Sequence, residues 1–276
     1  MIPQNFEYSA PRTLPDALAL LADPDCKILA GGMSLIPMMK LRLAAPSHVV
    51  DLGRVPELNR ISESGGVVHI GAMATHHEIE IAAAVRGRAP LLAEVASSIG
   101  DVQVRNRGTI GGSIAHADPA ADYPAALLAL EANIRVVSAS SDRVIAASDF
   151  FLDAFTTALE PGEIVLEIQV PAEDSAEGWA YEKVAHPASG FAVVGVAARV
   201  RKQGTRIAMA RIGITGLAAC AFRDRTAEQQ LEAGGAAVFA QGAQPSSDLY
   251  ASADYRLHLA RIHGARALQA ALAKIA

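Results

Sequence analysis

The stretch RNRGTIGGSIAHADPAADYP, residues Arg105–Pro124, places a glycine pair, Gly111-Gly112, directly before a serine. A shorter version stands earlier in the chain, in KILAGGMSLIPMMK, where Gly31-Gly32 are followed by one residue and then Ser34. Glycine lacks a Cβ and can adopt positive φ, so successive backbone N–H groups of such a loop can converge on a phosphate. Two loops of this kind suggest one anionic ligand held from two sides.

Each glycine pair taken alone also fits an ordinary tight turn, so other nucleotide signatures serve as a check. A Rossmann fold would show G-x-G-x-x-G after its first strand, and a P-loop would show G-x-x-x-x-G-K-[ST]. Neither pattern occurs in the sequence. A phosphate-bearing ligand would therefore need a different architecture.

Composition narrows the class of protein. The 276 residues are 51% hydrophobic and 19% charged, with a net charge of -5 and basic residues scattered along the chain. This argues against a nucleic-acid partner. No apolar run reaches the roughly 18 to 20 residues of a membrane span, and the amino terminus does not resemble a signal peptide, so we expect a cytoplasmic protein. The only cysteines, Cys26 and Cys220, cannot hold an iron–sulfur cluster or structural zinc by themselves.

Periodicity predicts an α+β chain. Helices are expected at residues 13–21, 75–87, 90–100, 123–132 and 226–234 and near the carboxyl end, and β-rich runs at 26–32, 48–52, 66–73, 134–138, 143–147 and 163–170. A hairpin is expected around the turn at 202–205. The polar stretch VPAEDSAEGW at 170–179 indicates a boundary between domains 1–175 and 176–276, the first with subdomains of about 1–55 and 56–175.

Both glycine motifs, together with YEKVAHPASGFAVVGVA at 181–197, resemble the FAD-binding medium subunit of the molybdenum hydroxylases, the xanthine dehydrogenase and carbon monoxide dehydrogenase family. The resemblance implies a vanillyl-alcohol-oxidase (PCMH) type fold, in which two α+β subdomains hold FAD, and a carboxy-terminal α+β domain of the carbon monoxide dehydrogenase flavoprotein type. It also implies two pyrophosphate loops, made of Ala30, Gly31, Gly32, Met33, Ser34 and Leu35 and of Thr109, Ile110, Gly111, Gly112 and Ser113.

The same resemblance places Asp122 near the adenosine half of FAD and Lys183 near the flavin. Met33 stands where the family usually has a polar residue, so only backbone contacts are expected there. The implied function is electron transfer: the chain supplies no catalytic residue, and FAD passes electrons from [2Fe-2S] clusters to NAD+, a quinone or oxygen. The clusters would belong to a small subunit and the molybdopterin to a large one, assembled as a dimer of heterotrimers.

Two other hypotheses stay open at this point. His116, Asp118 and Asp122 form H-x-D-x-x-x-D, whose residue types suit a divalent ion in a metal-dependent hydrolase. A non-catalytic scaffold that keeps the fold without the cofactor is the other. The pair His76-His77 is interpreted as a solvated helix start capped by Thr75, while the resemblance implies, as an alternative, that a residue of this stretch lies near the flavin edge. Replacing Gly111 or Gly112 by Val is expected to abolish FAD retention and leave the fold largely intact.

Overall fold

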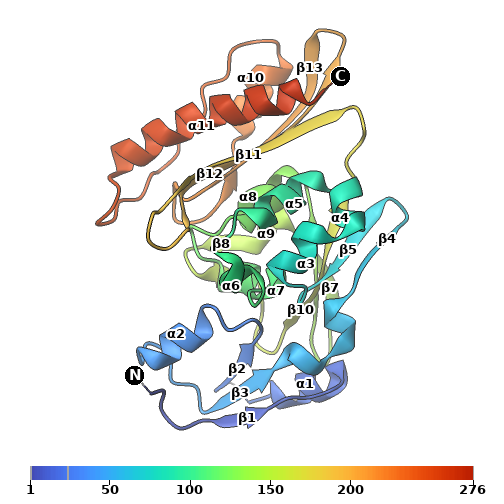
Figure 1. Cartoon of the computed structure of the whole chain (residues 1–276), viewed down its shortest axis with the longest axis vertical. Helices are drawn as coiled ribbons and strands as arrows, with labels where there is room; N and C mark the ends of the chain where they lie inside the picture. The colour runs from blue at the N-terminus through green and yellow to red at the C-terminus, as the bar shows by residue number, and fades with distance from the viewer. Residues whose placement is uncertain (1, 24, 276) are drawn as a thin grey trace.

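The computed structural model describes residues 2–23 and 25–275. Three blocks follow one another along the long axis of the molecule, in the order of the sequence (Figure 1). Each block combines a β-sheet with helices, so the predicted α+β fold class is confirmed. Within the described residues, no helix is both long and apolar enough to cross a membrane.

The amino-terminal block is a small parallel sheet with strand order β1-β3-β2. Its core, which includes Ala17, Cys26 and Val50, also contains Val137 and Ile164 from the middle block, so the two blocks pack together. The helix after the first strand begins at Thr13, whose side chain accepts a hydrogen bond from the backbone N–H of Asp16. The elements are β1 (Glu7–Ser9), α1 (Leu14–Leu20), β2 (Cys26–Leu29), α2 (Leu35–Lys40), β3 (His48–Asp51) and the 3-10 turns η1 (Leu52–Arg54) and η2 (Pro56–Asn59).

The middle block is a five-stranded antiparallel sheet in the order β4-β5-β10-β6-β7. Its central strands alternate, with Val68, Ile70, Ile168 and Val170 fully buried. The strands are β4 (Ile61–Ser64), β5 (Val67–Gly71), β6 (Asn133–Val137), β7 (Asp142–Ala146) and β10 (Ile164–Pro171), with a hairpin of β8 (Phe151–Asp153) and β9 (Thr156–Thr157). The helices are α3 (His76–Ile81), α4 (Ala83–Arg88), α5 (Pro90–Ser97), α6 (Val102–Arg105), α7 (Ile110–His116), α8 (Tyr123–Ala129) and α9 (Ala147–Phe150).

The predicted helix at 75–87 begins where expected but is divided in two. Thr75 and Glu78 form a reciprocal capping box at the start of α3. Ala82 then takes an extended conformation, with ψ 124°, and α4 starts at the next residue. This break redirects the chain so that α4 packs on α5.

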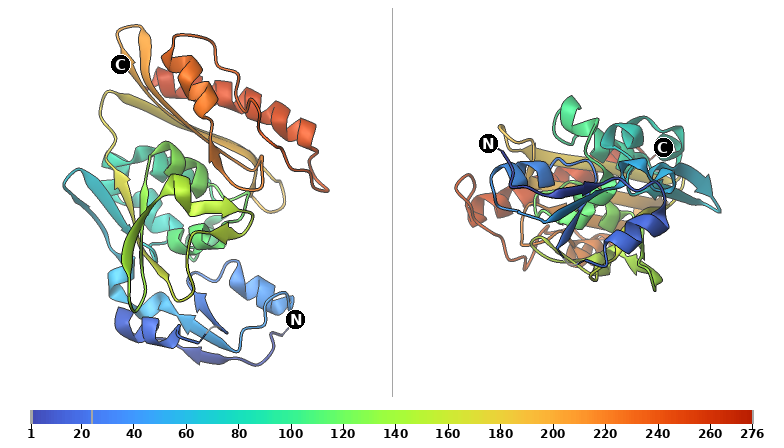
Figure 2. Two further views of the ribbon diagram at one scale, coloured as in Figure 1. Left: turned by 180° about the vertical axis from the view of Figure 1, so that it is seen from behind. Right: turned by 90° about the horizontal axis from the view of Figure 1, so that it is seen from below.

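The carboxy-terminal block is an antiparallel sheet with helices on both faces. Its elements are β11 (Glu177–Ala185), β12 (Ala192–Gln203), β13 (Arg206–Thr215), β14 (Phe222–Arg223), α10 (Arg225–Glu232) and α11 (Ala253–Ala273). A Cβ on Gly178 would lie 1.9 Å from the carbonyl oxygen of Ala271 in α11, and one on Gly213 would lie 2.0 Å from that of Ala125 in α8. The missing side chains at Gly178 and Gly213 therefore let α11 and α8 approach the sheet closely. Helices α5 and α8 lie between this sheet and the sheet of the middle block (Figures 1 and 2).

The connection between the last two blocks is shorter than the sequence suggested. Strand β10 runs to Pro171 and β11 starts at Glu177, so only residues 172–176 form the loop. Glu177 can lie in a buried strand because Arg199 of β12 donates to it over 2.7 Å. The predicted division at residue 175 falls in this loop. It stays a prediction, because the main hydrophobic core includes Tyr181 and Ala197 from beyond it.

Glu173 in this loop is a buried carboxyl with one oxygen unpaired. Its Oε1 accepts a hydrogen bond from the backbone N–H of Leu91 (3.1 Å), whereas Oε2 has no partner among the described residues. Burial raises the pKa of Glu173 from its ordinary 4.5 to about 7. The folded chain therefore binds this proton more tightly than the unfolded chain, and the free energy of unfolding falls as pH rises from 4.5 through 7.

We expect Glu173→Gln to remove this loss of stability. At pH 5 the variant and the parent should unfold at similar urea concentrations. At pH 8 the variant should be more stable by on the order of 2 kcal/mol, because it buries an amide instead of an unpaired charge. Asp174→Asn, at the exposed neighbouring position, serves as the control. An equal stability difference between Glu173→Gln and the parent at both pH values would contradict the assignment.

Candidate functional site

The two glycine loops lie against each other, although 80 positions separate them in the sequence. The first loop, Ala30–Leu35, joins β2 to α2. The second, Thr109–Ser113, follows Arg107 and Gly108 and forms the start of α7. A Cβ on Gly31 would lie 2.0 Å from the carbonyl oxygen of Arg107 and 2.8 Å from Cα of Gly108. A Cβ on Gly112 would lie 3.1 Å from Cβ of Ala30. The fold thus brings the two sequence motifs into one site.

Close packing, more than positive φ, explains the glycines. Of the four, only Gly32 has positive φ, at +77°. Gly111 lies in α7, and a Cβ there would meet the carbonyl oxygen of Ala72 at 2.6 Å. The expectation that Gly111→Val leaves the fold intact is therefore wrong, because the added side chain would collide with neighbouring backbone.

The N–H groups of the second loop already have protein partners. Those of Ile110 and Gly111 donate to the carbonyl oxygens of Ala74 (3.1 Å) and Ala72 (2.8 Å). Those of Gly112 and Ser113 donate to Oγ1 and the carbonyl oxygen of Thr109, over 3.1 and 3.0 Å. The second loop is therefore a fixed support held to the segment after β5, with few donors left for a ligand.

The first loop differs in this respect. The N–H groups of residues 31–35 make no hydrogen bond to any residue that the structure describes, and the Ser34 side chain does not cap α2. Gly31 and Gly32 are buried nonetheless. Since a buried backbone donor without a partner is costly, this run of donors fits an anionic oxygen-rich ligand such as a pyrophosphate.

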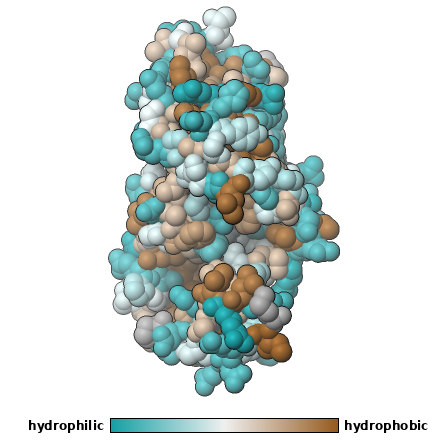
Figure 3. All heavy atoms as spheres, turned by 90° about the vertical axis from the view of Figure 1, so that its left-hand side faces the viewer, coloured by the Kyte–Doolittle hydropathy of each residue, from teal (hydrophilic) through white to brown (hydrophobic). Residues whose placement is uncertain are grey.

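Apolar side chains are exposed in the first loop and after the helix that follows it. Met33 is 41% exposed, and Leu41 and Leu43 after α2 are also exposed. The face that carries α2 shows apolar side chains gathered over this helix, and the surface is hollowed above them (Figure 3). A ligand held by the first loop would therefore have an apolar rim beside it.

Asp122 and Lys183 form a buried ion pair. Lys183 Nζ donates to Asp122 Oδ2 over 2.9 Å and to the carbonyl oxygen of Ser98 over 3.1 Å, while the Tyr181 hydroxyl donates to Asp122 Oδ1 over 2.5 Å. Burial raises the pKa of Asp122, and the Lys183 ammonium and Tyr181 hydroxyl oppose that shift. The resemblance placed these two residues at opposite halves of FAD, whereas the structure joins them at one point between the middle and carboxy-terminal blocks.

His116, Asp118 and Asp122, the residues of the metal hypothesis, each contact a different group in the structure. The His116 ring packs on Phe155, with centroids 5.1 Å apart, and Asp118 accepts from the backbone N–H of Ala120. Asp122 is occupied by Lys183 and Tyr181. Across residues 2–23 and 25–275, no three His, Cys, Asp or Glu side chains gather closely enough to hold a metal ion. The hydrolase hypothesis finds no support.

His76 is not the solvated helix residue that the sequence suggested. It is 4% exposed, and its Nδ1 lies 3.1 Å from the hydroxyl of Tyr123. Burial, with a smaller contribution from Arg105, lowers the pKa of His76 to about 4. His77 beside it is the surface residue, 3.7 Å from Glu80.

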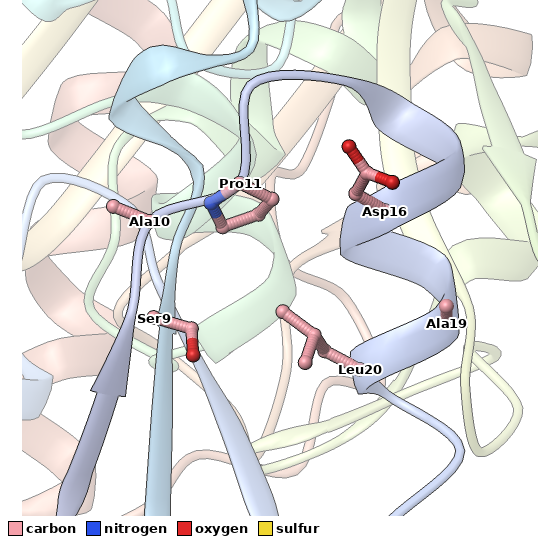
Figure 4. A pocket seen from close by; sticks show the side chains of 6 residues that line it. All are labelled: Ser9, Ala10, Pro11, Asp16, Ala19 and Leu20. Carbon is pink, nitrogen blue, oxygen red and sulfur yellow. The ribbon is translucent and has the colours of Figure 1, made fainter.

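A groove of about 500 Å³ in the amino-terminal block is unrelated to these loops. Figure 4 shows that the end of β1 and helix α1 supply its walls. Its only charged lining residue is Asp16, and none of the predicted site residues reaches it. Its lining consists of Ser9, Ala10, Pro11, Asp16, Ala19 and Leu20.

Known proteins match the chain over nearly its whole length. Residues 4–173 match the family described as the FAD binding domain in molybdopterin dehydrogenase, and residues 179–271 match the carbon monoxide dehydrogenase flavoprotein C-terminal domain. The carbon monoxide dehydrogenase medium chain of Hydrogenophaga pseudoflava is 44% identical, with both chains covered completely.

Solved structures agree. Carbon monoxide dehydrogenase from Hydrogenophaga pseudoflava, in a form that lacks the Mo-pyranopterin moiety of its cofactor, gives a TM-score of 0.97 with both chains covered. Quinoline 2-oxidoreductase from Pseudomonas putida 86 gives 0.92 at 35% identity, again over both complete chains. These matches confirm the predicted resemblance, fold and oxidoreductase class: the chain belongs to the family of FAD-binding medium subunits of the molybdenum hydroxylases.

Proposed function

We propose that this chain holds FAD by its pyrophosphate on the backbone N–H groups of residues 31–35, with the second glycine loop as the support behind them. The observation that carries this assignment concerns the backbone N–H groups of residues 31–35. They have no hydrogen-bond partner among the described residues, although Gly31 and Gly32 are buried. The residues present fit the cofactor, since several converging backbone N–H groups can hold a doubly charged pyrophosphate.

For the second loop we propose fewer hydrogen bonds to FAD than the resemblance implies. Thr109, Ile110, Gly111, Gly112 and Ser113 would contact FAD mainly through van der Waals packing, because their N–H groups are already hydrogen-bonded. Met33 and Leu35 of the first loop would supply backbone donors. Asp122 and Lys183, being one ion pair, would act at the same part of FAD, and the Asp122 charge offsets that of Lys183.

FAD supplies the redox chemistry when bound, exchanging electrons between one-electron and two-electron partners. The chain's own contribution is to bind and orient the cofactor and to present one edge of it to other subunits. The sequence contains only Cys26 and Cys220, both free thiols in the structure, so it cannot ligate iron–sulfur clusters itself.

The electron donors therefore belong to other chains. We propose a small iron–sulfur subunit and a large molybdopterin-binding subunit as partners, in a dimer of heterotrimers that passes electrons through FAD to a terminal acceptor. Relatives of this chain serve enzymes named for carbon monoxide and for quinoline, which supports a substrate site outside this subunit. The free thiols agree with a reducing compartment, and we propose a cytoplasmic location.

The cofactor assignment predicts an absorption spectrum. Purified full-length chain, reconstituted with FAD, should show the near-ultraviolet and blue flavin bands after gel filtration, at one FAD per chain. Metal analysis of the isolated chain should find no stoichiometric metal, whereas the complex should contain molybdenum and iron. If FAD fails to bind even with the partner subunits present, the proposed function is wrong.

A further inference from the structure

The buried side chain of His76 lies between the amino-terminal end of α8 and the segment that leads into the second glycine loop. On one side its ring meets Tyr123 edge-on, with centroids 5.2 Å apart and an interplanar angle of 60°, and Nδ1 is hydrogen-bonded to the Tyr123 hydroxyl. On the other side, Nε2 lies 2.5 Å from where a Cβ of Gly108 would stand, so the ring packs on the bare Cα of that glycine. The His76 backbone N–H also donates to the Gly108 carbonyl oxygen over 3.0 Å.

The contact continues from Gly108 to the first loop. Cα of Gly108 and the carbonyl oxygen of Arg107 are the atoms against which Gly31 packs. Four groups are therefore in contact one after another. They are the Tyr123 hydroxyl, the His76 ring, the Gly108 backbone and the Gly31 backbone. All four residues are buried, so a change in the size of one is transmitted to the next.

We propose that His76 is a positioning residue for the cofactor loops, acting through Gly108 on the donors that begin at Gly31. The inference rests on the proposed FAD site. Hydrogen bonds to a phosphate weaken steeply once the distance leaves the usual range, so the position of Gly31 relative to Gly108 decides how well the donors converge. The ring sets that position as a spacer, and the Tyr123 hydroxyl fixes the orientation of the ring.

The charge of His76 matters to this arrangement because no carboxylate in residues 2–23 and 25–275 is hydrogen-bonded to its ring. Arg105, at the end of α6, is the charged group that acts on the His76 ring, while Asp122 and Glu80 act on Tyr123 beside it. Among the residues that the structure describes, the Tyr123 hydroxyl is the side-chain group hydrogen-bonded to the ring. Protonation would place a positive charge beside the Gly108 backbone without a compensating partner, and we expect it to displace the loop.

Three variants test the proposal in the full-length chain with FAD as the probe. His76→Ala removes the spacer, and we expect the FAD dissociation constant to rise at least roughly tenfold, the equivalent of one lost charge-assisted hydrogen bond. Tyr123→Phe deletes a single oxygen and should give a smaller rise in the same direction. His76→Gln keeps a polar group that reaches Tyr123 and should restore part of the affinity. His77→Ala, at the exposed neighbour, should bind FAD like the parent.

Two readouts separate positioning from general destabilisation. The ³¹P chemical shifts of bound FAD should change in His76→Gln and Tyr123→Phe, while the thermal midpoint of the cofactor-free chain stays close to that of the parent. FAD release from the parent should increase as the pH falls toward 4, and His76→Gln should shift or remove that increase. Unchanged affinity, ³¹P shifts and pH profile in Tyr123→Phe and both His76 variants would overturn the proposal. A parent chain that binds no FAD would overturn the proposed function as well.

Discussion

Gly31→Ala is expected to weaken FAD binding by roughly 100-fold or more. The added methyl would lie 2.0 Å from the carbonyl oxygen of Arg107, so the two loops must separate by roughly 1 Å to reach normal van der Waals distance. The backbone donors of residues 31–35 would move with the first loop. Loss of two hydrogen bonds to a charged group, at about 1.5 kcal/mol or more each, accounts for the expected factor.

The measurement is FAD affinity by flavin fluorescence, together with the thermal midpoint of the cofactor-free chain. Gly87→Ala is the matched control, since a Cβ there meets no atom within 4 Å and its φ is not positive. The control should bind FAD like the parent. Normal FAD affinity in a folded Gly31→Ala chain would show that the contact between the loops does not position the donors.

Lys183→Met is expected to lower the free energy of unfolding by about 3 kcal/mol, because it leaves the Asp122 carboxylate buried with only the Tyr181 hydroxyl as partner. The side chains of Lys183 and Asp122 are 8% and 4% exposed, so water cannot replace the lost ammonium. The carbonyl oxygen of Ser98 also loses a donor. Urea unfolding at neutral pH measures the loss.

The double variant Asp122→Asn with Lys183→Met should recover most of that stability, since it removes both charges together. Asp142→Asn, in the exposed pair with Arg135, is the control and should change stability little. If each single variant at the buried pair is as stable as the parent, the pair does not hold the blocks together. A double variant that is stable but binds FAD weakly would show that these side chains also touch the cofactor.

Local sequence was a good guide to the elements. The helix start at Thr75, the hairpin that turns after Gln203 and the long final helix follow from capping residues, alternation and apolar spacing. Strand β11 was missed because its first residues are charged or small, and local pattern cannot show that Glu177 finds Arg199 on the next strand. The break at Ala82 was also missed, since Ala82 and the alanines that follow it are good helix formers.

For the candidate site too, some features could be predicted from the sequence and others could not. The glycine motifs identified the two loops, but from the motifs alone both loops are expected to donate equally to a phosphate. Hydrogen bonding to Ala72 and Ala74 makes the second loop a support, and that partner segment carries no motif of its own. His76 was interpreted as a surface residue because a polar pair at a helix start is usually solvated, and only the packing of Tyr123 and Gly108 buries it.

By itself, the sequence determined the α+β class, the family and the absence of a cluster-binding cysteine set, because motifs, periodicity and cysteine count are properties of the linear chain. The tertiary structure alone decided which N–H groups lack partners, that Asp122 and Lys183 form one ion pair, and that His76 supports Gly108. Each of these depends on contacts between residues far apart in the chain. Hydrogen-bond satisfaction and burial are set by such contacts, and a local pattern does not encode them.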